Sequence, residues 1–165
     1  MPAMQTTTFS RRRWSILAAF SPCLLLFAGC DGSSSGTTTI SSQQLSGKVG
    51  GQAWTFTQGE TDSFLSDSST FFMTLYASTF TACSTLAPPE DAGTIIMVIP
   101  RTPGSYDLSA ARSATFSIPP SDNWVALQGH VQISEVTATT ITGGAKITYN
   151  GDNTVEGQFQ ASICQ

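Results

Sequence analysis

Residues 145–163 read AKITYNGDNTVEGQFQASI, and this stretch decides the fold class of the chain. Apolar or small side chains occupy every second position over 145–149 and again over 155–163, with polar side chains between them. A period of two residues is the pattern of a β-strand that has one buried and one solvated face. The sequence NGDN at 150–153 is typical of a tight hairpin turn. The stretch therefore predicts a β-hairpin with one wet face.

The sequence before this hairpin also has the pattern of β-strands. Residues 70–77 (TFFMTLYA) and 94–99 (TIIMVI) are apolar at both parities, which is typical of central strands covered on both faces. A short strand is expected over 113–118, where two prolines stop it, and residues 124–136 end in clear alternation. Turn signals at intervals near ten residues favour a sandwich or a small barrel.

These patterns predict a single all-β domain over residues 45–165, either an antiparallel β-sandwich or a small β-barrel. No stretch has a clean helical period of 3.6 residues, although residues 62–67 and 107–112 each fit one helical turn. One domain is also the expectation for a chain of 165 residues.

The composition excludes several classes of function. Only 11% of the residues are charged, and eleven acidic residues outnumber seven basic ones, which argues against charge-driven disorder and against a basic nucleic-acid surface. The single histidine, His130, restricts both histidine-based catalysis and histidine-ligated metals. We therefore expect no nucleic-acid partner, no cofactor and no metal.

The N-terminus has the pattern of an export signal. Arg11, Arg12 and Arg13 precede an apolar run over 14–28, which is shorter than the roughly 20 residues that a membrane-spanning helix needs. A basic start, a short apolar core and then small residues are typical of a secretory signal peptide with a helical core. We expect this signal peptide to occupy residues 1–29.

The end of the signal, Leu26-Phe27-Ala28-Gly29-Cys30, resembles the lipobox of bacterial lipoprotein precursors. The resemblance implies a diacylglyceryl thioether on Cys30, cleavage before it, and acylation of the new amine by a chain such as palmitate. Two or three acyl chains would give long-lived attachment to membrane lipid, whereas one chain gives only marginal binding. The implied location is the bacterial cell envelope, anchored to the inner or outer membrane on its periplasmic or surface face.

The export route stays open at this stage. Residues 10–14 (SRRRW) also resemble the start of a twin-arginine signal, an alternative to the general secretory route. After Cys30, residues 31–44 read DGSSSGTTTISSQQ, a polar sequence of low complexity that predicts a flexible tether. The processed chain would keep four basic and eleven acidic residues, a net charge of −7, so lipid rather than charge must hold it at the membrane.

Two cysteines remain in the expected domain, Cys83 and Cys164. Export to an oxidising compartment makes a disulfide between them the expectation. Cys164 has the parity of the wet face, so the bridge is expected at a strand end and not in the middle of the core. A catalytic cysteine would need His130 beside it, and a metal site would need further soft ligands.

Few other residues suggest a ligand. Trp54 and Trp124 are candidate ligand contacts, either as platforms on which a sugar stacks or as ordinary core aromatics. His130 lies on the solvated parity of its strand, where it is either a surface histidine or a functional one.

Residues 46–56 (SGKVGGQAWTF) and 129–133 (GHVQI) are similar to parts of small β-rich lipoprotein domains of unknown function. The resemblance implies a β-rich, surface-attached domain and nothing about its activity. We expect a non-catalytic domain that binds an envelope protein or glycan or has a structural role. Two alternatives stay open: a β-barrel that carries a small apolar ligand, and a hydrolase that relies on carboxylates such as Asp107, Asp122 or Glu135.

Overall fold

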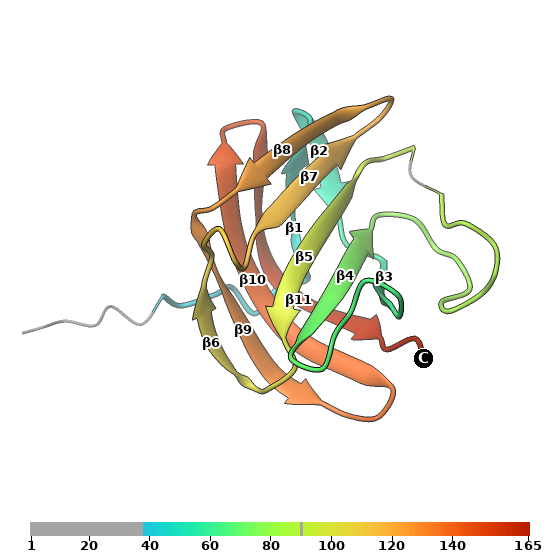
Figure 1. The fold of residues 1–165 in the computed structure, drawn as a ribbon. Helices are drawn as coiled ribbons and strands as arrows, with labels where there is room; N and C mark the ends of the chain where they lie inside the picture. The colour runs from blue at the N-terminus through green and yellow to red at the C-terminus, as the bar shows by residue number, and fades with distance from the viewer. Residues whose placement is uncertain (1–37, 90) are drawn as a thin grey trace, which may run out of the picture. The chain divides into compact units, whose positions relative to one another are not determined.

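The computed structural model describes residues 38–89 and 91–165, and this part of the chain contains eleven β-strands and no α-helix (Figure 1). The all-β prediction is confirmed. None of the described residues belongs to a helix that could cross a membrane. The expected signal peptide, Cys30 and most of the expected tether lie outside the described residues. The strands are β1 Ser46–Val49, β2 Gln52–Thr55, β3 Gln58–Asp62, β4 Thr70–Tyr76, β5 Thr94–Pro100, β6 Gly104–Asp107, β7 Ala114–Ile118, β8 Asp122–Ala126, β9 Gly129–Val136, β10 Thr140–Asn150 and β11 Asn153–Ser162.

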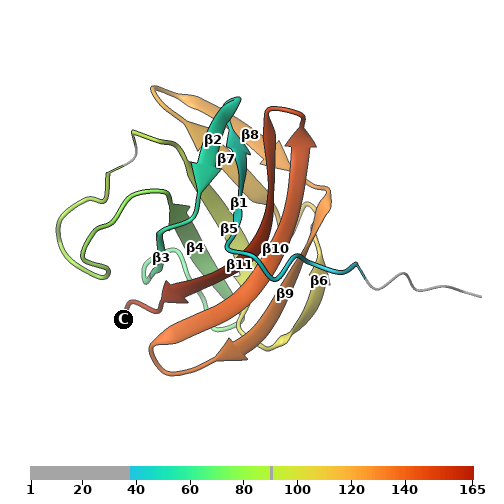
Figure 2. The same cartoon turned by 180° about the vertical axis from the view of Figure 1, so that it is seen from behind.

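All eleven strands belong to one sheet, whose main path has the order β6-β9-β10-β11-β3-β4-β5-β7-β8. The sheet curls into a half-barrel, so that β4, β5, β7 and β8 face β9, β10 and β11 across the interior (Figures 1 and 2). The sequence predicts a purely antiparallel sheet, but the pairing is mixed, because β3 joins β11 in parallel at Ser162 and Glu60.

The hairpin predicted from residues 145–163 is confirmed as β10 and β11. Asn150 opposes Asn153 across the turn, and the Asn150 Oδ1 accepts hydrogen bonds from the Asp152 N–H at 3.0 Å and from the Asn153 side chain at 3.1 Å. The buried Asn153 in turn accepts the Gly50 N–H at 2.9 Å. Gly50 and Gly51 both have positive φ, as a two-residue hairpin turn requires. The hydrogen bond from Gly50 to Asn153 therefore docks the β1–β2 turn on the β10–β11 turn.

The second edge of β11 is divided between three partners. β1 pairs with its first half, β3 meets its end, and the segment just before β1 fills the space between them. There the Gln158 N–H donates to the Gln43 carbonyl at 2.7 Å, and the Ser41 N–H donates to Glu156 at 3.1 Å. Ile40 is also buried. Residues 40–44, which the sequence assigns to the tether, are therefore bound to the sheet.

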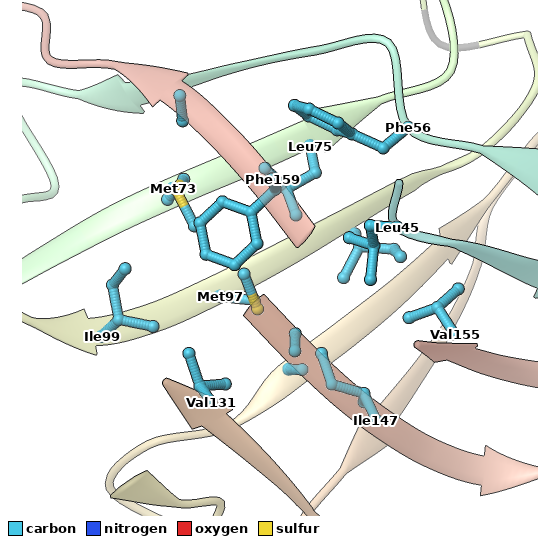
Figure 3. Packing of buried hydrophobic residues seen from close by; sticks show 14 of the residues in the cluster. Leu45, Phe56, Met73, Leu75, Met97, Ile99, Val131, Ile147, Val155 and Phe159 are labelled. Atoms are coloured by element: carbon cyan, nitrogen blue, oxygen red, sulfur yellow. The ribbon is translucent and has the colours of Figure 1, made fainter. Parts of the chain in front are cut away.

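The interior of the half-barrel is filled by side chains from every part of the sheet. Figure 3 shows Phe159 of β11 among residues from strands that are far apart in sequence, with Met73, Met97 and Leu45 around it. Both β4 and β5 bury every second side chain and leave the others half-exposed, except for the paired Tyr76 and Thr94 at one end, which are also buried. The expectation that these two strands are covered on both faces is therefore wrong, because a single curled sheet has only one interior.

One of the two expected helical turns is present in the described residues. The Ser66 N–H donates to the Asp62 carbonyl at 3.0 Å, which closes a single helical turn over residues 62–66. At the other position, Ser109 and Arg112 close a tight turn by exchanging backbone hydrogen bonds of 2.9 and 3.1 Å. The expected stretch 124–136 is divided between β8 and β9.

Candidate functional site

The predicted Cys83–Cys164 disulfide is present, with a Cα–Cα distance of 5.2 Å. Cys83 lies in the long β4–β5 loop and Cys164 lies just beyond β11, so the bridge is at a strand end as expected. The backbone N–H of Cys83 donates to Glu60 Oε2 at 2.6 Å. Glu60 and the two sulfur atoms lie close enough to hold a metal, but sulfur in a disulfide is not the thiolate that a soft metal prefers. This cluster is a covalent staple.

Trp54 is not a surface ligand contact. Its side chain is only 2% exposed, and its Nε1 donates to the Gly93 carbonyl at 3.1 Å. Trp54 lies on the buried parity of β2 and packs in the core of the half-barrel. Of the two ways to explain this tryptophan, the structural one is correct.

Trp124 is placed differently, and it is the sequence-derived candidate that reaches the surface. It pairs with the buried Phe116 across the β7–β8 hairpin, so both point to the inner side of the sheet. Because β8 is the last strand of the path, none of the described strands pairs with its other edge, and Trp124 stays 41% exposed. Tyr149 of β10 contacts it there instead, with ring centroids 5.3 Å apart and planes tilted by 33°.

Tyr149 lies near the end of β10, where the β10–β11 ladder is irregular. A register shift lies between Thr148 and Asn150, and Tyr149 is exposed whereas Ile147 is buried. The sequence pattern assigned Tyr149 to the same face as Ile147 and so missed it as a surface residue. No feature of the sequence alone locates this irregularity.

The aromatic pair is half-exposed. Trp124 is 41% and Tyr149 is 43% exposed, and we call these two residues the aromatic surface. Beside it lies a shallow hollow of about 260 Å³, and Gln128 and Thr148 provide polar groups at its wall. Half-exposed rings next to hydrogen-bonding side chains form a surface that can take a flat ligand with one apolar face.

His130 is not simply solvated. Its side chain is only 15% exposed, and both ring nitrogens have partners. Nδ1 lies 2.9 Å from Asp107 Oδ1, and Nε2 lies 2.6 Å from Ser105 Oγ. The sequence pattern missed Ser105 because β6 was not predicted. Alternate residues of a strand share a face, so a predicted strand here would have placed Ser105 and Asp107 side by side.

A second hollow of about 260 Å³ adjoins His130 and is lined in part by Asp107, Lys146, Gln128 and Thr148. Lys146 is paired with Glu156, whose Oε2 lies 3.0 Å from the ammonium nitrogen. The hydrogen bond from Lys146 lowers the pKa of Glu156, burial opposes this effect, and the Ser41 N–H adds to the lowering. Gln128 and Thr148 also line the hollow beside the aromatic surface, so the two hollows share a wall.

The carboxylates considered for a hydrolase are placed on separate strands. Asp122 lies on β8 and Glu135 on β9, whereas Asp107 on β6 contacts His130. Comparison of the chain with protein-family models, with curated proteins and with solved structures gives no match. The aromatic surface and the polar groups beside it are therefore the observations on which a function can rest.

Proposed function

We propose that this protein is a lipid-anchored module of the bacterial cell envelope that binds a glycan through its aromatic surface. The single observation that carries the proposal is the pair Trp124 and Tyr149, held half-exposed on two different strands of the sheet. Large apolar rings left exposed next to a hollow cost solvation free energy unless a ligand covers them.

The chemistry of the surface favours a sugar over a purely apolar ligand. One face of a pyranose ring presents C–H groups that pack against an aromatic ring, and its hydroxyl groups need hydrogen-bonding partners. The side chains of Gln128 and Thr148 line the adjacent hollow and supply such partners. The net charge of the processed chain disfavours strongly anionic polymers, so a glycan of low charge is the better ligand.

The carrier alternative lacks comparable support. A barrel that holds a small apolar ligand needs an internal cavity, but the interior of this half-barrel is filled by large side chains (Figure 3). Phe71, Phe116, Met73 and Met97 are all fully or almost fully buried there.

Co-sedimentation with insoluble glycan tests the binding proposal. The chain with Cys30→Ser is incubated with purified peptidoglycan in one arm and with an immobilised outer polysaccharide of the envelope in the other, because both contain pyranose rings. We expect the wild-type surface to bind in at least one arm and Trp124→Ala to weaken binding at least tenfold. Tyr149→Ala should weaken binding as well.

The matched control is Phe64→Ala, since Phe64 is also an exposed aromatic residue but lies in the β3–β4 loop, away from the aromatic surface. This variant should bind as the wild type does. Circular dichroism checks that each variant keeps its strand content. Equal binding of Trp124→Ala and wild type, or no binding in either arm, would contradict the proposal.

The lipid anchor is tested separately through Cys30. The sequence around Cys30 resembles a lipobox, and the acidic domain has no basic patch to hold it at a membrane. Cys30→Ser should move the protein from the detergent phase to the aqueous phase in a phase-partitioning experiment. If the variant stays in the detergent phase, lipidation of Cys30 is not what attaches the protein.

A further inference from the structure

We propose that Ser105 is a nucleophile for acyl transfer, activated by His130 and oriented through Asp107. Ser105 Oγ lies 2.6 Å from His130 Nε2, and His130 Nδ1 lies 2.9 Å from Asp107 Oδ1. A hydroxyl on one ring nitrogen and a carboxylate on the other is the connectivity that lets imidazole accept a hydroxyl proton. This activity goes beyond glycan binding.

The strand register brings the three side chains together. Asp107 of β6 stands directly opposite His130 of β9, and Ser105 lies two residues away on the same face of β6. The neighbouring Leu108 N–H donates to the Gly129 carbonyl at 2.9 Å. Because hydrogen-bonded and non-hydrogen-bonded pairs alternate, Asp107 and His130 form a non-hydrogen-bonded pair, in which side chains approach most closely.

The same alternation directs the backbone groups of Ser105 and Asp107 away from β9, toward the outer edge of β6. The Arg112 Nε donates to the Asp107 carbonyl at 3.2 Å, which agrees with that direction. β6 is the first strand of the sheet path, so its outer edge has no strand paired to it among the described residues. The Ser105 N–H and the Arg112 cation thus lie along one edge, where they can stabilise an oxyanion.

The reaction is ester hydrolysis in two steps. Ser105 Oγ bonds to the carbonyl carbon of an ester while its proton passes to His130 Nε2. The alcohol then leaves with that proton, and an acyl group remains on Ser105. Water attacks the acyl group in the second step, gives its proton to Nε2, and the carboxylic acid leaves as the proton returns to Ser105.

The position of the site indicates the substrate class. The hollow beside His130 and the hollow beside the aromatic surface share Gln128 and Thr148. A sugar that contacts Tyr149 can therefore reach across the shared wall toward His130, and the substrates we assign are small acyl esters carried by that glycan. This assignment of substrate rests on the proposed function, whereas the reactivity of Ser105 does not.

Labelling with a fluorophosphonate probe tests the nucleophile on the full chain in detergent-solubilised membranes. We expect the folded wild-type protein to be labelled, Ser105→Ala to lose the label, and Asp107→Asn to be labelled at least tenfold more slowly. The matched control is Ser134→Ala, because Ser134 is an exposed serine of β9 whose Oγ donates to the Thr142 carbonyl at 3.0 Å. This variant should be labelled as the wild type is.

Three further outcomes keep the proposals separate. Trp124→Ala should keep the probe label, since the label needs only the nucleophile, but should lose hydrolysis of O-acetylated glycan. Absence of label on folded wild type, or equal label on Ser105→Ala, would overturn the nucleophile and leave glycan binding untouched. Labelled protein that does not release acetate from any O-acetylated envelope glycan would overturn the substrate assignment.

Discussion

Replacement of both bridge cysteines, Cys83→Ser with Cys164→Ser, should destabilise the domain by about 4.5 kcal/mol. The bridge spans 81 positions, and the chain-entropy relation for a loop of that length gives about 15 cal/mol/K, or about 4.5 kcal/mol at 25 °C. The strands should survive, because the bridge lies outside all of them. The N–H of Cys83 bonds to Glu60 and that of Cys164 to Thr61, so serine substitution leaves both bonds possible.

Urea unfolding followed by circular dichroism measures this loss. With a slope of about 2 kcal/mol per molar urea, the midpoint should fall by about 2 M. Wild-type protein treated with a reductant should unfold like the serine variant, and the variant itself should not respond to reductant. A loss below about 1 kcal/mol would refute the loop-closure argument, and a loss of strand signal before urea is added would show that the bridge is needed for the fold itself.

Two further predictions concern residues 40–44, which dock beside β11, and the β3–β4 loop, which contains Asp67. Gly157 has φ of +141°, and a Cβ there would lie 2.6 Å from the Gln43 carbonyl oxygen, so Gly157→Ala should cost about 1–3 kcal/mol and accelerate amide exchange where the segment docks. Gly151→Ala, where a Cβ meets nothing within 4 Å, should change stability by less than about 0.5 kcal/mol; equal effects would contradict the docking. Hydrogen bonds from Ser69 and Thr70 lower the pKa of Asp67 from 3.8 to about 2. These bonds therefore stabilise the β3–β4 loop fully at pH values above the ordinary pKa, and they are lost as the pH falls through about 2. The Thr70 amide signal should titrate near pH 2 and not in Asp67→Asn; a midpoint near 4 would contradict the bonds.

The sequence predicts the fold class well because its strongest signal is local. The β10–β11 hairpin follows from a period of two on both sides of an Asn-Gly-Asp-Asn turn. In the curled sheet, β9 pairs with one side of this hairpin, and β1 and β3 pair with the other. The disulfide is also predictable, since residues 45–165 contain only two cysteines. These inferences depend on composition and periodicity, which do not require knowledge of the register between distant strands.

The candidate sites were harder to predict because they depend on that register. Trp124 of β8 meets Tyr149 of β10 only because the sheet curls and brings these two strands together. His130 acquires its partners only when β6 pairs with β9, and the four residues of β6 carry no pattern long enough to identify a strand. The polar segment before β1 looks like a tether, but its backbone fills a gap beside β11 that a sequence pattern does not show.

The indole N–H signals of the protein offer the most direct test of glycan binding at the aromatic surface. Residues 31–165 contain two tryptophans, and their signals in a ¹H–¹⁵N spectrum are assigned with Trp124→Ala. Trp54 is a built-in control, because its Nε1 is buried and bonded to the Gly93 carbonyl. On addition of soluble peptidoglycan fragments or soluble outer polysaccharide, our account predicts a saturable shift of the Trp124 signal while the Trp54 signal stays in place. No shift with either glycan, or equal shifts of both signals, would contradict it.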